Sequence, residues 1–376
     1  MAMDRLFALM KEKEASDMFL AINSPIQLKI NGNLVPINQQ KMDQATIMAL
    51  LGEVVPLEKI KELEKTNELN MGIPVAGIGS FRLSAFRQRG SVSAVLRYIP
   101  VIIPKFEDLH LPPILMEIIK QKRGLILVVG ATGSGKSTTI ASMLDHRNEM
   151  MAGHILTLED PVEFLFRNKK SIVNQREIGV DADSLTVALK NALRQAPDCI
   201  LIGEIRDKDT MQAALAYAQS GHLVVTTLHA NNSYRALNRI ISFFPIETRD
   251  AMLSDLASTI SAVVSQRLVP STNGGRTPAV EVLLNTRHVS ELIEQGNISQ
   301  IKEAIEKSMS PGSQTFEQAL MNLINEGLVT QENALANADS ATNLYWLINN
   351  AGGKTQEPEL PKEEEGATFT EFTLNM

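Results

Sequence analysis

One stretch of the chain decides its fold: residues 130–138 read Gly130-Ala131-Thr132-Gly133-Ser134-Gly135-Lys136-Ser137-Thr138. The stretch fits the pattern G-x-x-x-x-G-K-[ST], in which main-chain N–H groups surround the phosphates of a nucleotide. Its glycines allow this backbone path because they carry no Cβ. The Lys136 side chain would reach the β- and γ-phosphates, and the Ser137 hydroxyl would bind Mg²⁺. The whole stretch is therefore predicted to bind ATP together with Mg²⁺.

The residues on both sides of the loop match the context that this motif requires. Leu125–Val129 is short, apolar and rich in β-branched residues, which is typical of a buried parallel strand. Thr139–Leu144 predicts a helix, whose N-terminus would add a partial positive charge facing the phosphates. The order strand, glycine loop, helix favours a phosphate site over a chance glycine-rich turn.

Further strands and helices alternate after the loop. The predicted strands are Leu125–Val129, His154–Leu158, Cys199–Ile202 and Leu223–Leu228, separated by helical patterns at Ser184–Gln195 and Asp209–Ser220. This alternation predicts a parallel sheet with helices on both faces, in which ligands bind at the carboxyl ends of the strands. Four polar side chains follow those strands and are expected to meet in one crevice: Lys136, Glu163, Glu204 and His229.

The acidic residues of this crevice suggest hydrolysis. Glu204 follows an apolar strand, where P-loop enzymes place an acidic residue near Mg²⁺ and the attacking water, so Ser137 and Glu204 are the predicted metal ligands. Glu159, Asp160 and Glu163 lie in one turn, and such clustering costs free energy unless a cation or water uses it. Glu163 is the candidate general base and Glu159 the alternative; the sequence leaves both open. His229 could sense the γ-phosphate.

The chain divides into regions of different character. Residues 1–100 predict a mixed α/β domain, 101–114 a proline-rich linker, 115–270 the nucleotide-binding domain, 271–350 a helical extension and 351–376 a disordered acidic tail. Beyond the predicted parallel sheet, the patterns favour helices at Tyr234–Ser242 and Glu247–Leu268, a turn at residues 273–275, a strand at Ala279–Leu284 and three short helices up to Asn349.

Composition excludes several classes of protein. The net charge of −7 argues against nucleic acid as the main partner. No apolar run reaches the length of a membrane span, and the N-terminus lacks a signal-peptide core, so we expect a cytoplasmic protein without direct membrane insertion. The single cysteine, Cys199, excludes an intrachain disulfide and a tetracysteine zinc site.

Taken together, these motifs resemble the secretion and pilus ATPase superfamily, and within it the PilT/PilU retraction ATPases of type IV pili. Gly130–Thr138 is similar to their Walker A motif, Glu159–Glu163 to their aspartate box, Gly203-Glu204 to their Walker B motif and residues 221–229 to their histidine box. The resemblance implies an N-terminal PAS-like α/β domain, a RecA-like P-loop ATPase domain and a C-terminal helical extension. It also implies that Arg82 and Arg97 reach the nucleotide.

The same resemblance implies a biological setting. It points to a hexameric motor at the cytoplasmic face of the inner membrane that drives pilus retraction and twitching motility, in contact with an inner-membrane platform protein. Extension-type ATPases carry a tetracysteine zinc module, which is absent here. PilT-type proteins carry an Ala-Ile-Arg motif where this chain reads Thr286-Arg287-His288, and this chain adds an acidic tail. These departures resemble the PilU type and imply an accessory to a PilT-type ATPase.

Overall fold

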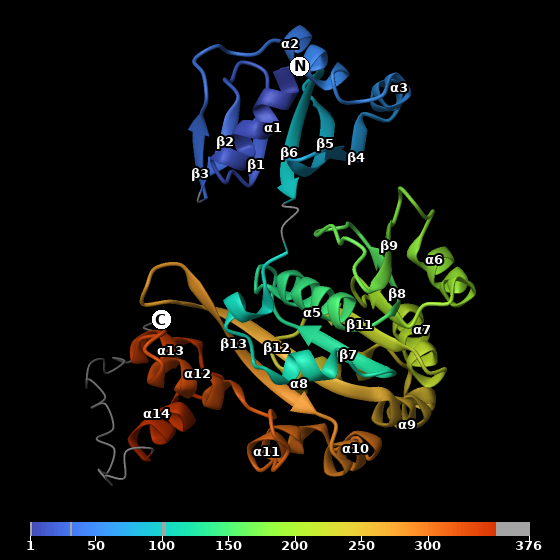
Figure 1. The fold of residues 1–376 in the computed structure, drawn as a ribbon, viewed down its shortest axis with the longest axis vertical. Helices are drawn as coiled ribbons and strands as arrows, with labels where there is room; N and C mark the ends of the chain where they lie inside the picture. The colour runs from blue at the N-terminus through green and yellow to red at the C-terminus, as the bar shows by residue number, and fades with distance from the viewer. Residues whose placement is uncertain (1, 31, 100–102, 351–376) are drawn as a thin grey trace, which may run out of the picture.

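The computed structural model describes residues 2–30, 32–99 and 103–350 (Figure 1). The predicted acidic tail, residues 351–376, lies outside the described residues, as does part of the predicted linker. None of the helices in the described part of the chain has the length and apolar character needed to cross a membrane.

The N-terminal region folds around a six-stranded antiparallel sheet with the strand order β3-β2-β1-β6-β5-β4. Its helices pack on the sheet through an apolar core in which the Phe7 ring stacks on Phe81, with ring centroids 4.0 Å apart. Arg82 on β5 and Arg97 on β6 are paired across neighbouring strands. The elements are α1 (Ala2–Glu12), β1 (Asp17–Leu20), β2 (Gln27–Ile30), β3 (Asn33–Pro36), α2 (Gln44–Gly52), α3 (Leu57–Thr66), β4 (Glu68–Val75), β5 (Gly79–Gln88) and β6 (Ser91–Ile99).

The second region is built on a seven-stranded sheet with the strand order β13-β12-β7-β11-β10-β8-β9. β13 pairs antiparallel with β12, and the other pairs are parallel. The strands are β7 (Gly124–Val129), β8 (Gly153–Glu159), β9 (Ser171–Glu177), β10 (Cys199–Ile202), β11 (Leu223–Leu228), β12 (Ile260–Pro270) and β13 (Arg276–Leu284). The predicted parallel sheet is therefore present, with additional strands at both edges.

Helices cover both faces of this sheet (Figure 1). Side chains of β7 alternate between the faces, because Leu125 and Leu127 join one core cluster while Ile126 joins the other. This two-sided burial explains why β7 reads as a continuous apolar run. The helices before β12 are α4 (Ile114–Ile118), α5 (Lys136–Met150), α6 (Leu185–Ala192), α7 (Lys208–Gln219), α8 (Ser233–Ser242) and α9 (Arg249–Thr259).

Part of the segment predicted as a linker packs on the second region. Phe106, in the short 3-10 helix η1 (Phe106–Leu109), is buried, and so is Leu111. Both belong to the core cluster that includes Ile140 of α5. The core of the second region therefore includes side chains that precede residue 115, because apolar residues between the prolines of the predicted linker are buried in that core.

The prediction of one helix over Glu247–Leu268 is wrong. Helix α9 ends at Thr259 and β12 begins at Ile260, so the second half of that stretch is a strand. Its apolar residues fit a helical period, but the β-branched residues from Val263 onward pair with β7 on one side and β13 on the other. Long-range strand pairing overrides the local pattern here. The sheet also extends beyond residue 270, the predicted end of the nucleotide-binding domain, as far as Leu284.

Two further strands and the C-terminal helices differ from prediction. β4 and β9 are edge strands with many polar or exposed side chains, so their sequences carry no clear strand signal. The C-terminal region holds more helices than the three predicted: α10 (Arg287–Glu294), α11 (Ile301–Glu306), α12 (Phe316–Asn325), α13 (Gln331–Asn337) and α14 (Ala341–Asn350). Threonine side chains cap the N-termini of three of these helices: Thr286 caps α10, Thr315 caps α12 and Thr330 caps α13.

Candidate active site

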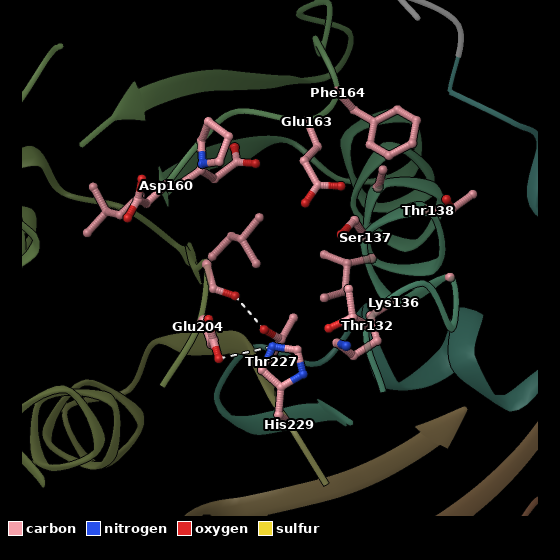
Figure 2. A pocket seen from close by; sticks show the side chains of 18 of the residues that line it. Thr132, Lys136, Ser137, Thr138, Asp160, Glu163, Phe164, Glu204, Thr227 and His229 are labelled. Atoms are coloured by element: carbon pink, nitrogen blue, oxygen red, sulfur yellow. Dashed lines mark hydrogen bonds and ion pairs between the residues drawn. The ribbon is translucent and has the colours of Figure 1, made fainter. Parts of the chain in front are cut away.

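A cavity of about 760 Å³ opens at the carboxyl ends of the parallel strands (Figure 2). It brings together most of the residues that the sequence predicted: Thr132, Gly133, Gly135, Lys136, Ser137, Thr138, Glu159, Glu163, Glu204 and His229. Gly130, Ala131, Ser134, Arg82 and Arg97 do not line it. Two residues that were not predicted, Leu268 and Arg276, contribute to the wall from the β12–β13 hairpin.

The loop after β7 has the backbone that a phosphate site needs. Gly133 and Gly135 have positive φ values of 76° and 88°, which residues with side chains rarely adopt. A Cβ on Gly130 would lie 2.3 Å from Ser134 Oγ, so the loop closes tightly on itself. Helix α5 begins directly at Lys136 and points its N-terminus into the cavity. These positions require glycine for steric reasons, as the motif predicted.

Lys136 lies at the base of this loop. Its Nζ donates hydrogen bonds to the main-chain oxygens of Gly130 at 2.8 Å and Ala131 at 2.9 Å. Burial lowers the pKa of Lys136, while the nearby carboxylates of Glu204 and Glu163 oppose that shift. The two loop carbonyls therefore hold the ammonium group close to where phosphates would bind.

Gln266 on β12 braces the loop from the side. Its Nε2 donates to the main-chain oxygen of Ser134 at 2.8 Å, and its Oε1 accepts from Thr139 Oγ1 at 2.7 Å. The Gln266 side chain is buried, and a Cβ on Gly135 would lie 2.7 Å from its Nε2. The sequence reasoning missed Gln266 because it assigned this segment to a helix; the β-branched residues Ile260, Val263 and Val264 are the signal that could have revealed the strand.

The two candidate bases have different environments. Glu159 is buried, and its Oε1 accepts hydrogen bonds from Thr157 Oγ1 at 2.6 Å and Gln175 Nε2 at 3.3 Å. Burial raises the pKa of Glu159, and these hydrogen bonds oppose the shift. Glu163 is exposed, and its carboxylate points into the cavity towards Ser137 (Figure 2). Both side chains line the cavity, but Glu163 is free to reach into it, whereas hydrogen bonds hold the buried Glu159 in a fixed position in its wall.

Glu204 forms the opposite side of the cavity. Its Oε2 accepts a hydrogen bond from Arg206 Nε at 2.8 Å, and its Oε1 lies 3.2 Å from His229 Nε2 (Figure 2). Hydrogen bonding to Glu204 raises the pKa of Arg206. Thr227 Oγ1 donates to the main-chain oxygen of Gly203 at 2.6 Å and joins the two strand ends that carry Glu204 and His229. The expected convergence of these side chains is present.

The two predicted arginines lie in different surroundings. Arg82 Nη2 lies 4.0 Å from Glu177 Oε2, at the end of β9 in the second region. Glu177 Oε2 also accepts a hydrogen bond from the main-chain N–H of Val162 at 3.2 Å, within the turn that carries Glu163. Burial lowers the pKa of Arg82, and Glu177 opposes the shift. Arg97 Nε instead donates to Asp17 Oδ1 at 2.8 Å inside the N-terminal region.

Comparisons with known proteins show the family to which the chain belongs. The family described as type II/IV secretion system protein matches residues 3–274. The type IV pilus ATPase PilU of Pseudomonas aeruginosa is 44% identical over 353 residues, which cover 93% of this chain and 91% of that protein. The retraction ATPase PilT of the same organism is 36% identical over 334 residues, covering 89% of this chain and 97% of PilT.

A solved structure extends the comparison to the fold. The crystal structure of the pilus retraction motor PilT with bound ADP has a TM-score of 0.84 and 38% identity, and the match covers 91% of this chain and 99% of that one. The predicted class, a mixed α/β fold with a RecA-like P-loop domain and C-terminal helices, is thereby confirmed. The chain belongs to the type II/IV secretion system protein family, in the group that contains the pilus ATPases PilU and PilT.

Proposed function

We propose that this protein hydrolyses ATP and uses the free energy to drive retraction of a type IV pilus, as an accessory to a PilT-type ATPase. One observation carries the proposal: Lys136 and Ser137 of the loop, together with Glu163 and Glu204, come from three separate parts of the sequence and line one cavity. The similarity to PilU and PilT supports the pilus as the setting, and the ADP bound to PilT supports an adenine nucleotide as ligand.

Each side chain has a task in the reaction. The loop N–H groups and Lys136 would bind the β- and γ-phosphates, so the loop would contribute most of the affinity for ATP. Glu163 would accept a proton from water as the water oxygen attacks the γ-phosphorus, which releases ADP and phosphate. Glu204 and His229 lie on the opposite side of the cavity from Glu163 and the loop. Arg82, next to the turn that carries Glu163, would stabilise the charge that spreads over the phosphoryl oxygens.

The donor atoms fit magnesium. Mg²⁺ prefers oxygen ligands and is usually bound by one or two protein groups together with substrate phosphates and water. Ser137 offers a hydroxyl and Glu204 a carboxylate on the two sides of the cavity. Within the described residues there is no group of three or more His, Cys, Asp or Glu side chains that would bind a metal without the nucleotide. Bound Mg²⁺ would neutralise phosphate charge.

The resemblance of the motifs to the pilus ATPases supports an assembly as well as a reaction. We propose a hexameric ring at the cytoplasmic face of the inner membrane, at the pilus base, that contacts the platform protein there. Neither nucleic acid nor the interior of the bilayer is a partner in this proposal, consistent with the net charge of −7.

The test is ATP hydrolysis by the purified protein, with and without Mg²⁺ and with and without a PilT-type ATPase. Lys136→Ala should reduce turnover by about 10²–10³-fold, because it removes the side-chain charge at the phosphates. Lys190→Ala, on the exposed side of α6, is the matched control and should hydrolyse ATP normally. Equal turnover and nucleotide affinity for Lys136→Ala and the parent would refute the assignment of the loop. Twitching motility of cells carrying the same variants tests the link to retraction.

A further inference from the structure

The connection between β11 and α8 contains His229 and is anchored at its far end by the C-terminal helices. β11 ends at Leu228 and α8 begins at Ser233, so His229 lies in a short connection. Residues Asn231 and Asn232 complete this connection, and both contact groups that come from much later in the chain. The path of the backbone after His229 therefore depends on packing beyond the parallel sheet.

Arg267 on β12 makes the first of these contacts. Its Nη2 donates to the main-chain oxygen of Asn231 at 3.1 Å and pairs with the Asp339 carboxylate. Its Nη1 donates to the main-chain oxygen of Asn337 at 2.7 Å, at the end of α13. The guanidinium also lies over the Phe316 ring of α12, 3.9 Å from the ring centre. Arg267 thus links the connection to the first two helices of the unit α12–α14.

Asp339 makes the second contact. Its Oδ2 accepts a hydrogen bond from Asn232 Nδ2 at 2.8 Å, while Oδ1 pairs with Arg267. The other end of the Asn232 amide, Oδ1, accepts from the main-chain N–H of Arg235 at 2.9 Å and caps α8. Asn232 is therefore fixed in both directions, towards its own helix and towards Asp339. A hydrogen bond to a charged acceptor such as this carboxylate is stronger than one between neutral groups.

β12 connects the two sides of this arrangement. Neighbouring side chains of a strand point to opposite faces, so Gln266 and Arg267 diverge. Gln266 reaches the phosphate loop at Ser134, and Arg267 reaches Asn231 behind His229. The unit α12–α14 packs on the β12–β13 hairpin through Phe316 and Val269 (Figure 1). The β12–β13 hairpin thus contacts the C-terminal helices, the phosphate loop and the connection that carries His229.

We propose that Asp339 is a positioning residue for His229. It holds Asn232 and, with Arg267, fixes the connection, so that His229 Nε2 keeps its place 3.2 Å from Glu204 Oε1. The C-terminal helices are then a structural part of the nucleotide site. The inference rests on the proposed function in so far as the His229–Glu204 contact serves ATP hydrolysis.

Two variants test the anchor in the full-length protein. Asn232→Ser keeps a good helix cap but removes the amide that reaches Asp339. Asp339→Ala removes the carboxylate itself. Glu303→Gln is the matched control, because it removes a carboxylate from the C-terminal helices that pairs with Lys307 at an exposed site. The measurements are kcat and KM for ATP, and amide hydrogen exchange of residues 229–235 without nucleotide.

Both variants should lower kcat by about 3- to 10-fold while KM changes by less than about 2-fold, because misorientation of a reacting group costs rate rather than affinity. Hydrogen exchange should accelerate in residues 229–235, and the Glu303→Gln control should match the parent in every measurement. A general loss of stability would instead accelerate exchange throughout the chain. A lower kcat caused only by a smaller fraction of active molecules would not be accompanied by faster exchange confined to residues 229–235.

The outcomes separate the two proposals. Accelerated local exchange with unchanged kcat overturns the positioning role, and unchanged exchange in Asn232→Ser overturns the anchor itself. If Asp339→Ala does not fold, Asn232→Ser decides alone. If the parent protein does not hydrolyse ATP under any condition, the proposed function fails. Hydrogen exchange of the two variants still tests the anchor: faster exchange in residues 229–235 supports it, and unchanged exchange contradicts it.

Discussion

The cavity has two walls that are built in different ways. The loop wall, residues 130–138, is continuous in sequence and is held by its own backbone and by Gln266. The acidic wall is assembled from the ends of β8, β10 and β11 and carries Glu163, Glu204 and His229. The loop wall presents N–H groups and an ammonium group, which suit phosphates, and the acidic wall presents carboxylates, which suit water and a metal ion. We therefore expect the loop wall to bind the phosphates and the acidic wall to take part in hydrolysis.

The largest expected effect concerns Arg82, which lies beside the acidic wall. An arginine that stabilises phosphoryl transfer is worth about 10³–10⁵-fold in rate, so Arg82→Ala should lower kcat far more than it lowers affinity. Arg97→Ala should have the smaller effect, because Arg97 pairs with Asp17 within its own region. Equal losses for both variants would contradict the distinction that the structure makes.

In the proposed hexameric ring, mixing of variant subunits would show whether Arg82 acts on its own subunit or on a neighbouring one. Lys136→Ala subunits are combined with Arg82→Ala subunits, and ATP hydrolysis is measured at several ratios. Partial recovery indicates that Arg82 acts on a neighbouring subunit, whereas no recovery indicates action within one chain. Parent-level activity of Arg82→Ala alone would exclude the role.

The second prediction separates the two carboxylates of the acidic wall. Glu163→Gln should keep ATP binding and lower kcat by about 10²–10⁴-fold, because the amide cannot accept the proton. Glu159→Gln should have a smaller effect, since Glu159 is buried in the cavity wall and hydrogen-bonded to Thr157 and Gln175. Single-turnover rates and nucleotide titration check both variants. The reverse order of effects would make Glu159 the base.

The third prediction concerns the loop wall. Gln266→Leu keeps the approximate size of the side chain but leaves Thr139 Oγ1 and the Ser134 carbonyl without their partner. A lost buried hydrogen bond costs about 1–3 kcal/mol, so ATP affinity should fall by about 10-fold or more, with a smaller change in kcat. Gln295→Leu, at an exposed position after α10, is the control. A lower kcat with unchanged ATP affinity in Gln266→Leu would contradict the assignment of phosphate binding to the loop wall.

The smallest expected effect concerns Glu281 on β13, which is buried and does not line the cavity. Its Oε1 accepts hydrogen bonds from Ser233 N, Ser233 Oγ and Ser265 Oγ at 2.7, 2.6 and 3.0 Å. Burial raises the pKa of Glu281, and these hydrogen bonds oppose the shift. A raised pKa in the folded state means that its contribution to stability is complete below the pKa of the unfolded chain and is lost as the pH rises through the folded pKa.

Glu281→Gln cannot titrate, so its melting temperature relative to that of the parent should rise as the pH is raised from about 5 to about 8, a range above the usual pKa of a glutamate carboxyl. Melting curves across this range check the trend. A difference between the two proteins that does not vary with pH would contradict it. kcat of the variant at neutral pH should stay close to that of the parent, since Glu281 belongs to neither wall.

Local sequence determined the loop wall and the strands that carry the acidic wall. The positive φ values of Gly133 and Gly135 are a property of the local backbone, so the conformation of Gly130–Thr138 could be predicted, although the distant Gln266 also restricts the space at Gly135. The strands β7, β8, β10 and β11 were predictable because burial on two faces leaves long apolar runs. Since parallel strands end at one edge of a sheet, the meeting of Glu204 with His229 followed as well.

The side chains that support this site could not be predicted, because contacts between distant elements place them. β12 is a strand because it pairs with β7 and β13, and this pairing places Gln266 on the loop. Burial separates Glu159 from Glu163, although the two are close in sequence. The contact of Asp339 with Asn232 joins residues that are 107 positions apart. Hydrogen bonds and burial of this kind depend on which distant elements pack together, and a local pattern of residues carries no record of that packing.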